Sequence, residues 1–130
     1  MFIDVVLPDI EVLYVDSDAG IPGAVEAFRR LEAPLPTLKG RRFYGVVQGD
    51  AYRACVARTP GDDPAGLGLA TWVIPGGKYR RARIRDWAQR TAEIGPAFDA
   101  LRAPGGVDPA RPGIEFYRSQ DELLVHVPVR

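Results

Sequence analysis

The expected secondary-structure elements occur in the same order twice along this chain of 130 residues. Helices are predicted near residues 20–33 and 85–103, because apolar residues recur there at helical spacing between proline- and glycine-containing breaks. Segments rich in β-branched and aromatic residues predict strands at residues 10–15, 43–47, 52–57, 67–74, 78–84, 114–117 and 123–129. The order is therefore strand, helix and two strands, followed by the same series again.

A short sequence repeat supports this division into two halves. Val5-Val6-Leu7-Pro8 resembles Trp72-Val73-Ile74-Pro75, with Pro8 and Pro75 separated by 67 positions (75 minus 8). Each half has one helix and too few apolar positions to cover a sheet alone. We therefore expect one α+β domain over residues 1–130, with half-repeats of about 1–63 and 64–130. The expected architecture is a duplicated βαββ module with pseudo-two-fold symmetry, an antiparallel sheet with the helices on one face, and a ligand cleft on the other.

Composition excludes several kinds of site and partner. A single cysteine, Cys55, permits no intramolecular disulfide and no cysteine-based zinc cluster, and a single histidine, His126, permits no multi-histidine metal site. We therefore expect no metal and no cofactor. Seventeen basic residues balance seventeen acidic ones, so no net field favours nucleic acid or an anionic membrane. No secretory signal and no membrane span is recognised, which makes the cytoplasm the expected location.

An acidic residue stands in a strand that is otherwise apolar and aromatic. In residues 113–118 side chains alternate between the faces of the strand, so Glu115 and Tyr117 share one face while Ile114 and Phe116 share the other. We expect the apolar pair to meet the helices and Glu115 to be partly desolvated in the cleft, which would raise its pKa. Such a cleft suits a hydrophobic cation, whereas the alternative is a half-exposed glutamate paired with one of many arginines.

Other large rings near the repeat boundaries are candidates for the walls of the cleft. Tyr79, Trp72 and Tyr52 are predicted as wall residues beside Tyr117, with ordinary core packing as the alternative for each. Trp87, on the second helix, is expected to belong to the core.

His126 and Cys55 are the residues that could support nucleophilic or acid–base chemistry. If residues 119–122 form a four-residue hairpin loop, Glu115 falls opposite His126, as either a structural or a catalytic pair. Nothing in the sequence places Cys55 near either residue, so a cysteine-hydrolase triad is not expected. Residues 78–85 contain five basic side chains, for which a solvated strand and helix start is favoured over a nucleic-acid patch. A contact for a protein partner is a further alternative.

These segments together resemble the GyrI-like small-molecule-binding domains, which also form the effector-binding part of many AraC-type and MerR-type multidrug-responsive regulators. The resemblance rests on short segments that extend from about residue 5 to residue 129: residues 52–56, 74–79, the helix bearing Trp87, residues 114–117 and residues 125–129. It implies a ligand cleft along the pseudo-dyad, with the acid of the Glu-x-Tyr motif at Glu115 and neighbouring aromatic positions at Tyr117 and Tyr79. With no room for a helix-turn-helix, the chain is similar to the stand-alone members.

Three functions follow as hypotheses. The first is a stand-alone protein that sequesters or senses amphipathic aromatic or cationic compounds through Glu115, Tyr117, Tyr79, Trp72 and Tyr52. The second is a cofactor-free hydrolase of reactive genotoxic small molecules in the same cleft, with Glu115 as general acid or base and a tyrosine that polarises the substrate. The third is an inhibitor that binds a larger enzyme through residues 78–85.

Overall fold

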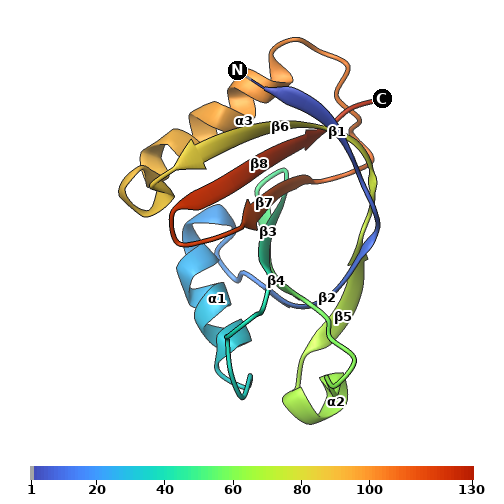
Figure 1. Cartoon of the computed structure of the whole chain (residues 1–130), viewed down its shortest axis with the longest axis vertical. Coiled ribbons are helices and arrows are strands. Elements are labelled where there is room, and N and C mark those ends of the chain that lie inside the picture. The colour runs from blue at the N-terminus through green and yellow to red at the C-terminus, as the bar shows by residue number, and fades with distance from the viewer. Residues whose placement is uncertain (1) are drawn as a thin grey trace.

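The computed structural model describes residues 2–130. The chain forms one eight-stranded antiparallel sheet, against which the helices pack (Figure 1). The strands follow the order β1-β6-β8-β7-β3-β4-β2-β5 in the sheet. Their bounds are β1 (Ile3–Leu7), β2 (Ile10–Asp16), β3 (Phe43–Gln48), β4 (Ala51–Ala57), β5 (Ala70–Ile74), β6 (Gly77–Arg85), β7 (Gly113–Tyr117) and β8 (Glu122–Pro128). The expected α+β class and antiparallel sheet are confirmed.

Two nine-residue helices lie against this sheet, α1 (Ala24–Glu32) and α3 (Ile94–Arg102). Each follows a single turn of 3-10 helix, at Ile21–Gly23 and at Thr91–Glu93, and another such turn spans Trp87–Gln89. The second helix therefore begins later than residue 85. Pro96 stands in the first turn of α3, where a backbone N–H has no partner within the helix.

The order of strands in the sheet is symmetric between the two halves of the chain. If each strand of β1–β4 is exchanged with its counterpart in β5–β8, the same order results when the sheet is read from its other edge. The series β2–α1–β3–β4 and β6–α3–β7–β8 both follow the predicted order, and each is preceded by an additional strand, β1 or β5. β1 pairs with β6 and β5 pairs with β2, so the first strand of each half completes the sheet of the other half. The expected strand at residues 67–74 begins only at Ala70, because Pro64–Leu67 forms the short helix α2.

The sheet is strongly curled, and its two faces bury different cores. On one face, α3 packs through Phe98 and Leu101, and α1 packs through Ala27 and Leu31. On the other face the ends of the sheet come together, so strands β1, β2 and β5 close over a second core. The buried members of that second core are Val12, Tyr44, Val46, Cys55, Ile74, Tyr79 and Ile114.

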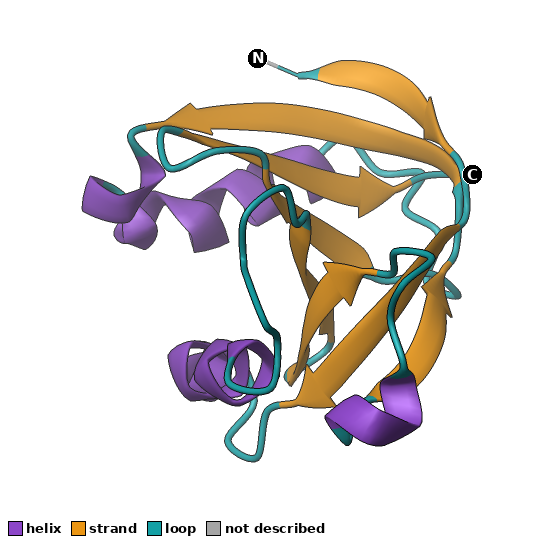
Figure 2. Ribbon diagram, turned by 60° about the horizontal axis from the view of Figure 1, so that its bottom comes forward, coloured by secondary structure: helices purple, strands orange, loops and turns teal. Residues whose placement is uncertain are grey.

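Figure 2 shows α1 and α3 on the same side of the curled sheet, with a space between them. The cleft described below opens there, on the helical face. The expectation of a cleft on the face opposite the helices is therefore wrong, because curling of the sheet fills that face with its own side chains. None of the helices within residues 2–130 has the length and apolar character needed to cross a membrane.

His126 lies beside the second core, edge to face with Tyr79, and does not face Glu115. The register of β7 against β8 places Ile114 opposite His126 and Glu115 opposite Val125. Pairing stops at Tyr117 and Leu123, so the connection is one residue longer than the four-residue loop that the Glu–His pair required. The buried imidazole instead accepts a bond from Arg81 Nε at Nε2 (3.0 Å), and its Nδ1 lies 3.3 Å from the Ile114 carbonyl oxygen.

This histidine predicts a loss of stability in mild acid. Burial, with a smaller contribution from Arg81, lowers the pKa of His126 from 6.5 to about 4. The native state therefore resists a protonation that the unfolded chain accepts, and stability is lost as the pH falls from 6.5 towards 4, by roughly 3 kcal/mol at most. Denaturant unfolding between pH 7 and pH 4 measures this loss. The variant His126→Asn should show a smaller loss over the same range, and equal losses in the two proteins would contradict the assignment.

Candidate ligand-binding cleft

A cleft of about 1140 Å³ separates α1 from α3 on the helical face of the sheet. Its volume is slightly above the range of about 300–1,000 Å³ that is usual for pockets that bind drug-sized molecules. The apolar and aromatic part of the lining comes from both helical segments, from the sheet between them and from the loop after α1. Its members are Ile21, Ala24, Val25, Phe28, Leu38, Phe43, Val47, Tyr52, Trp87, Ile94, Phe98 and Tyr117. The lining therefore suits an organic molecule with apolar groups.

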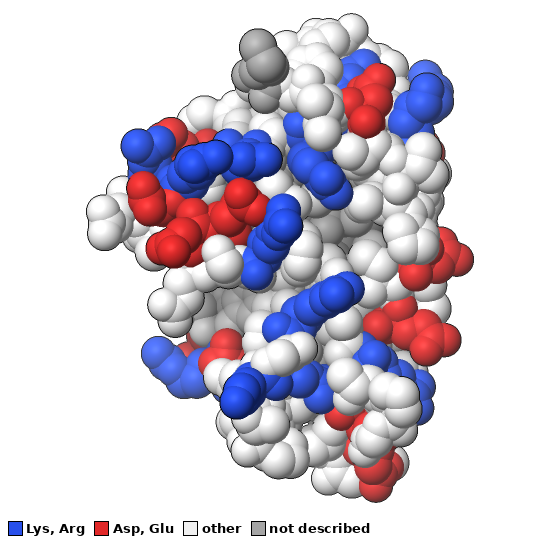
Figure 3. Space-filling model, in the orientation of Figure 1, with Lys and Arg blue, Asp and Glu red and all other residues white. Residues whose placement is uncertain are grey.

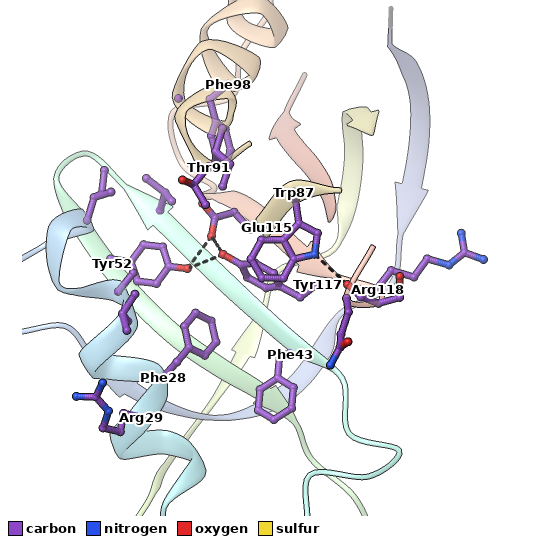
Figure 4. Close-up of a pocket in the computed structure, with 18 of the residues that line it drawn as sticks. Phe28, Arg29, Phe43, Tyr52, Trp87, Thr91, Phe98, Glu115, Tyr117 and Arg118 are labelled. Carbon is purple, nitrogen blue, oxygen red and sulfur yellow. Dashed lines mark hydrogen bonds between the residues drawn. The ribbon is translucent and has the colours of Figure 1, made fainter. Parts of the chain in front are cut away.

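Glu115 lies at the floor of this cleft between two tyrosines (Figure 4). Its side chain is 5 % exposed, and its Oε1 accepts hydrogen bonds from the hydroxyls of Tyr52 and Tyr117, each at 2.6 Å. The two hydroxyl oxygens lie 3.5 Å apart. Each phenol has one proton to donate, and both protons are directed at the same carboxylate oxygen.

The second carboxylate oxygen of Glu115, Oε2, accepts no hydrogen bond from residues 2–130. Both hydrogen bonds of this side chain end on Oε1. Among the described residues, Arg41 Nε is the side-chain polar atom that is both fully enclosed and without a hydrogen-bond partner. Oε2 also has no partner, but it is not fully enclosed. This oxygen therefore keeps some access to the cleft that Glu115 lines.

A glycine in the central strand makes room for the carboxylate and the phenols. Glu115 and Tyr117 alternate onto the helical face of β7, while Tyr52 reaches them from β4, two strands away. Gly45 on β3 lies between them, opposite both Glu115 and Ala54. A Cβ atom at this position would overlap the Tyr52 hydroxyl and Glu115 Oε1. The hydrogen-bonded group therefore depends on the missing side chain of Gly45.

Burial controls the ionisation of this group. It raises the pKa of Glu115 above its ordinary value of 4.5, and the two phenol hydrogen bonds oppose the rise by favouring the carboxylate. The pKa values of Tyr52 and Tyr117 are also raised, first by burial and then by the adjacent Glu115 charge. The phenols therefore stay protonated as donors, and Glu115 is the member that changes charge.

The arginines that line the cleft are neutralised by carboxylates other than Glu115. Arg29 pairs with Glu26 at 2.6 Å and Arg41 with Asp62 at 2.8 Å. Arg102 pairs with Asp99 at 3.5 Å and Arg118 with Glu122 at 3.2 Å. Basic and acidic side chains are likewise interspersed over the face drawn in Figure 3. Within residues 2–130, Glu115 forms no ion pair, so its charge remains uncompensated inside an apolar cleft.

Aromatic rings surround the carboxylate on the side of α1 and on the side of Trp87. Phe28 on α1 meets Tyr52 and Tyr117 edge to face, with ring centroids 6.2 Å and 5.5 Å apart. Trp87 packs on the other side of Tyr117 at 4.9 Å, and its Nε1 donates to the Ser119 carbonyl oxygen at 3.0 Å. The Tyr117 ring is thus held between Phe28 and Trp87, which fixes the direction of its hydroxyl.

The structure brings three of the five predicted ligand-binding residues together and separates the other two. Glu115, Tyr117 and Tyr52 line the cleft. Tyr79 is fully buried in the second core, where its hydroxyl donates to the Pro75 carbonyl oxygen. Trp72 is on that same face of the sheet, beneath the Arg53 guanidinium. Their strands place Tyr79 and Trp72 on the face that the curled sheet closes, so neither borders the cleft.

Sequence reasoning missed Phe28, Trp87 and Gly45 as parts of this site. Phe28 falls at helical spacing with Val25, a pattern that indicates core, and Trp87 was expected in the core for the same reason. Both rings do contact the core, and both also line the cleft. Gly45 could have been found from the sequence, since a glycine inside a strand marks a place where other atoms approach the backbone closely.

Within the described part of the chain, no group of three or more His, Cys, Asp or Glu side chains is placed to hold a metal ion.

Comparison with solved structures shows which proteins share this fold. The integron cassette protein VCH_CASS2 of Vibrio cholerae superposes with a TM-score of 0.74 at 15 % identity, covering 99 % of this chain and 95 % of that one. SAV2435, solved bound to tetraphenylphosphonium, has a TM-score of 0.64 at 12 % identity and 100 % and 94 % coverage. The EcmrR C-terminal domain has a TM-score of 0.62 at 13 % identity and 100 % and 97 % coverage.

These three similarities establish a shared fold over nearly the whole chain. The architecture is consistent with the GyrI-like fold that the sequence segments resemble. No protein-family model matches the chain, and no curated protein sequence matches it either.

Because the Tyr52 hydroxyl and Glu115 Oε1 occupy the space above Gly45, we expect a single methyl group at this position to destabilise the fold. Gly45→Ala should force the Tyr52 hydroxyl away from Glu115 and cost about 1–3 kcal/mol of unfolding free energy through the lost buried hydrogen bond. Urea denaturation measures the cost. In a Tyr52→Phe background the same substitution should cost less, because one of the overlapping atoms is absent. Equal costs in the two backgrounds would mean that Gly45 serves the strand backbone and not the hydrogen-bonded group.

Proposed function

We propose that this protein is a GyrI-like small-molecule-binding protein that takes up amphipathic aromatic compounds, cationic ones in preference, in the cleft between α1 and α3. Glu115 provides the counter-charge, Tyr52 and Tyr117 hold it in place, and Phe28 and Trp87 form the adjoining walls. Sequestering or sensing such a compound is the role that fits this site.

The uncompensated carboxylate at the floor of an apolar cleft carries this proposal. An ionised Glu115 loses solvation through burial, and within residues 2–130 no cationic side chain restores it. A ligand cation would supply the missing Coulomb attraction in surroundings where water screens it poorly. Aromatic rings beside the carboxylate would add cation–π attraction. An anion of the same shape would meet repulsion from the same carboxylate.

A structural neighbour supports the choice of ligand class. SAV2435 was solved with tetraphenylphosphonium, which is a permanent cation with four phenyl groups. The shared fold makes this ion a suitable probe here. At 12 % identity the comparison extends to the fold, so the argument for binding rests on Glu115 and its neighbours.

Hydrolysis in the same cleft has less support from the geometry. A hydrolase of the kind considered above needs a tyrosine hydroxyl that polarises the substrate while Glu115 acts as acid or base. Both nearby phenols donate their only proton to Glu115 Oε1. Neither phenol has a second proton to direct at a substrate carbonyl, so the arrangement favours holding a charge over transferring a proton.

A protein contact through residues 78–85 also has less support. The basic residues of this segment belong to β6, which lies inside the sheet between β1 and β8. Arg80 points to the helical face and donates to the Leu101 carbonyl oxygen, while Arg81 points to the opposite face and donates to His126. The basic side chains are thus divided between two faces and do not form one surface.

A pair of probes with opposite charge tests the proposed function. Tetraphenylphosphonium should bind saturably in isothermal titration calorimetry, while tetraphenylborate, which has nearly the same shape and a negative charge, should bind far more weakly. Glu115→Gln should weaken tetraphenylphosphonium binding about tenfold or more, equivalent to ~1.4 kcal/mol. Loss of the counter-charge is the reason, since the size and shape of the side chain are retained.

Glu11→Gln is the matched control, because it removes one carboxylate from an exposed position that does not line this cleft. It should leave the affinity unchanged. If Glu115→Gln binds the cation as tightly as the wild type does, Glu115 is not the counter-charge. Recovery of the unaltered probe after incubation distinguishes binding from turnover when a reactive electrophile replaces the phosphonium.

The raised pKa of Glu115 predicts that cation binding strengthens with pH. Since burial favours the protonated form in the folded protein, Glu115 contributes stability below its ordinary pKa and this contribution is lost as the pH rises through the raised value. A bound cation acts in the opposite direction, because it favours the carboxylate. Tetraphenylphosphonium does not titrate, so its affinity should fall by up to about tenfold per pH unit below the pKa of Glu115. Titrations from pH 5 to pH 9 measure this slope, and a flat profile for the wild type would contradict the assignment.

A further inference from the structure

The two oxygens of Glu115 differ in a way that narrows the ligand class, provided that the proposed function is correct. Oε1 accepts two short hydrogen bonds, each 2.6 Å long, from Tyr52 and Tyr117. Oε2 accepts none from residues 2–130 and keeps access to the cleft. Both donors that residues 2–130 offer to this carboxylate therefore bond to Oε1, and Oε2, the oxygen with access to the cleft, has none.

This asymmetry is held rigidly. Tyr52 is 3 % exposed and packs against Phe28, and the Tyr117 ring lies between Phe28 and Trp87. Rotation of the carboxylate to present Oε1 to the cleft would break both short hydrogen bonds. The free oxygen therefore stays directed at the cleft, with lone pairs that no donor within residues 2–130 satisfies.

A carboxylate oxygen held in this way is stabilised by a hydrogen-bond donor as well as by a positive charge. An ionised carboxylate accepts several hydrogen bonds, and those from a charged N–H are shorter and stronger than neutral ones. A quaternary cation supplies the charge but keeps its alkyl or aryl groups between the charge and the oxygen. A protonated amine or amidine supplies both the charge and the donor.

We infer that the cleft is built for a ligand with a protonated nitrogen whose N–H donates to Glu115 Oε2, and with aromatic groups that pack along α1 and α3. Arylalkyl amines and aryl amidines belong to this class. Permanent quaternary cations and phosphonium ions bind the same cleft through charge and ring contacts alone, and more weakly for their size.

A matched ligand pair tests this inference on the unmodified protein. Imipramine is a tricyclic tertiary amine that is protonated at neutral pH, and its N-methyl quaternary derivative has the same rings and the same charge without the N–H. Isothermal titration calorimetry at pH 7.5 should give the amine about tenfold higher affinity. In Glu115→Gln the difference should disappear, because the amide directs a carbonyl oxygen to the phenols and an NH₂ group to the ligand. Glu11→Gln should keep the full difference.

The outcomes separate the two proposals. If both compounds bind the wild type equally and both are weakened in Glu115→Gln, the N–H inference is overturned while cation binding stands. If neither compound nor tetraphenylphosphonium depends on Glu115, the proposed function fails as well. The comparison on the wild type alone decides the inference even if Glu115→Gln does not fold.

Discussion

Two phenolic protons held on one buried carboxylate oxygen define the chemistry of this cleft. The hydrogen bonds from Tyr52 and Tyr117 to Glu115 Oε1 join side chains from β4 and β7, which are separated by β3. They lower the cost of burying a carboxylate without cancelling its charge, since a phenol at neutral pH is a donor and not a cation. An arginine in the place of either tyrosine would have neutralised the site. The phenols keep Glu115 both buried and electrostatically available.

The curled sheet explains why this group can lie at the bottom of a cleft. Because each half contributes its first strand to the other half, the sheet closes around one face and fills it with the second core. The two long helices are left on the opposite face, each packed over its own part of the sheet. Between them the cleft is lined by residues of β3 and β7, the central pair of strands. Gly45 and Glu115 face each other there, so the strand position without a side chain lies beside a buried acid that forms no ion pair within residues 2–130.

Much of this arrangement could be predicted from local sequence patterns. Alternation along residues 113–118 correctly places Glu115 and Tyr117 together and apart from Ile114 and Phe116. The face on which the helices lie could not be predicted from that strand, because both sets of its side chains become buried, one against helices and the other against the curled sheet. Tyr79 and Trp72 were misplaced for this reason. The His126 pairing failed on another point, because one additional residue in a hairpin loop shifts the register and exchanges the faces.

The role of Gly45 could not be predicted from the sequence, although the glycine itself is visible there in a predicted strand. A glycine inside a β-strand weakens the strand, and its position gives no indication of which atoms occupy the space. Here the space belongs to a tyrosine hydroxyl from one neighbouring strand and a carboxylate from the other. The binding group therefore occupies the surface of the sheet itself, below the level at which a β-carbon would stand. The ligand proposed above would have to enter to that depth to reach Glu115.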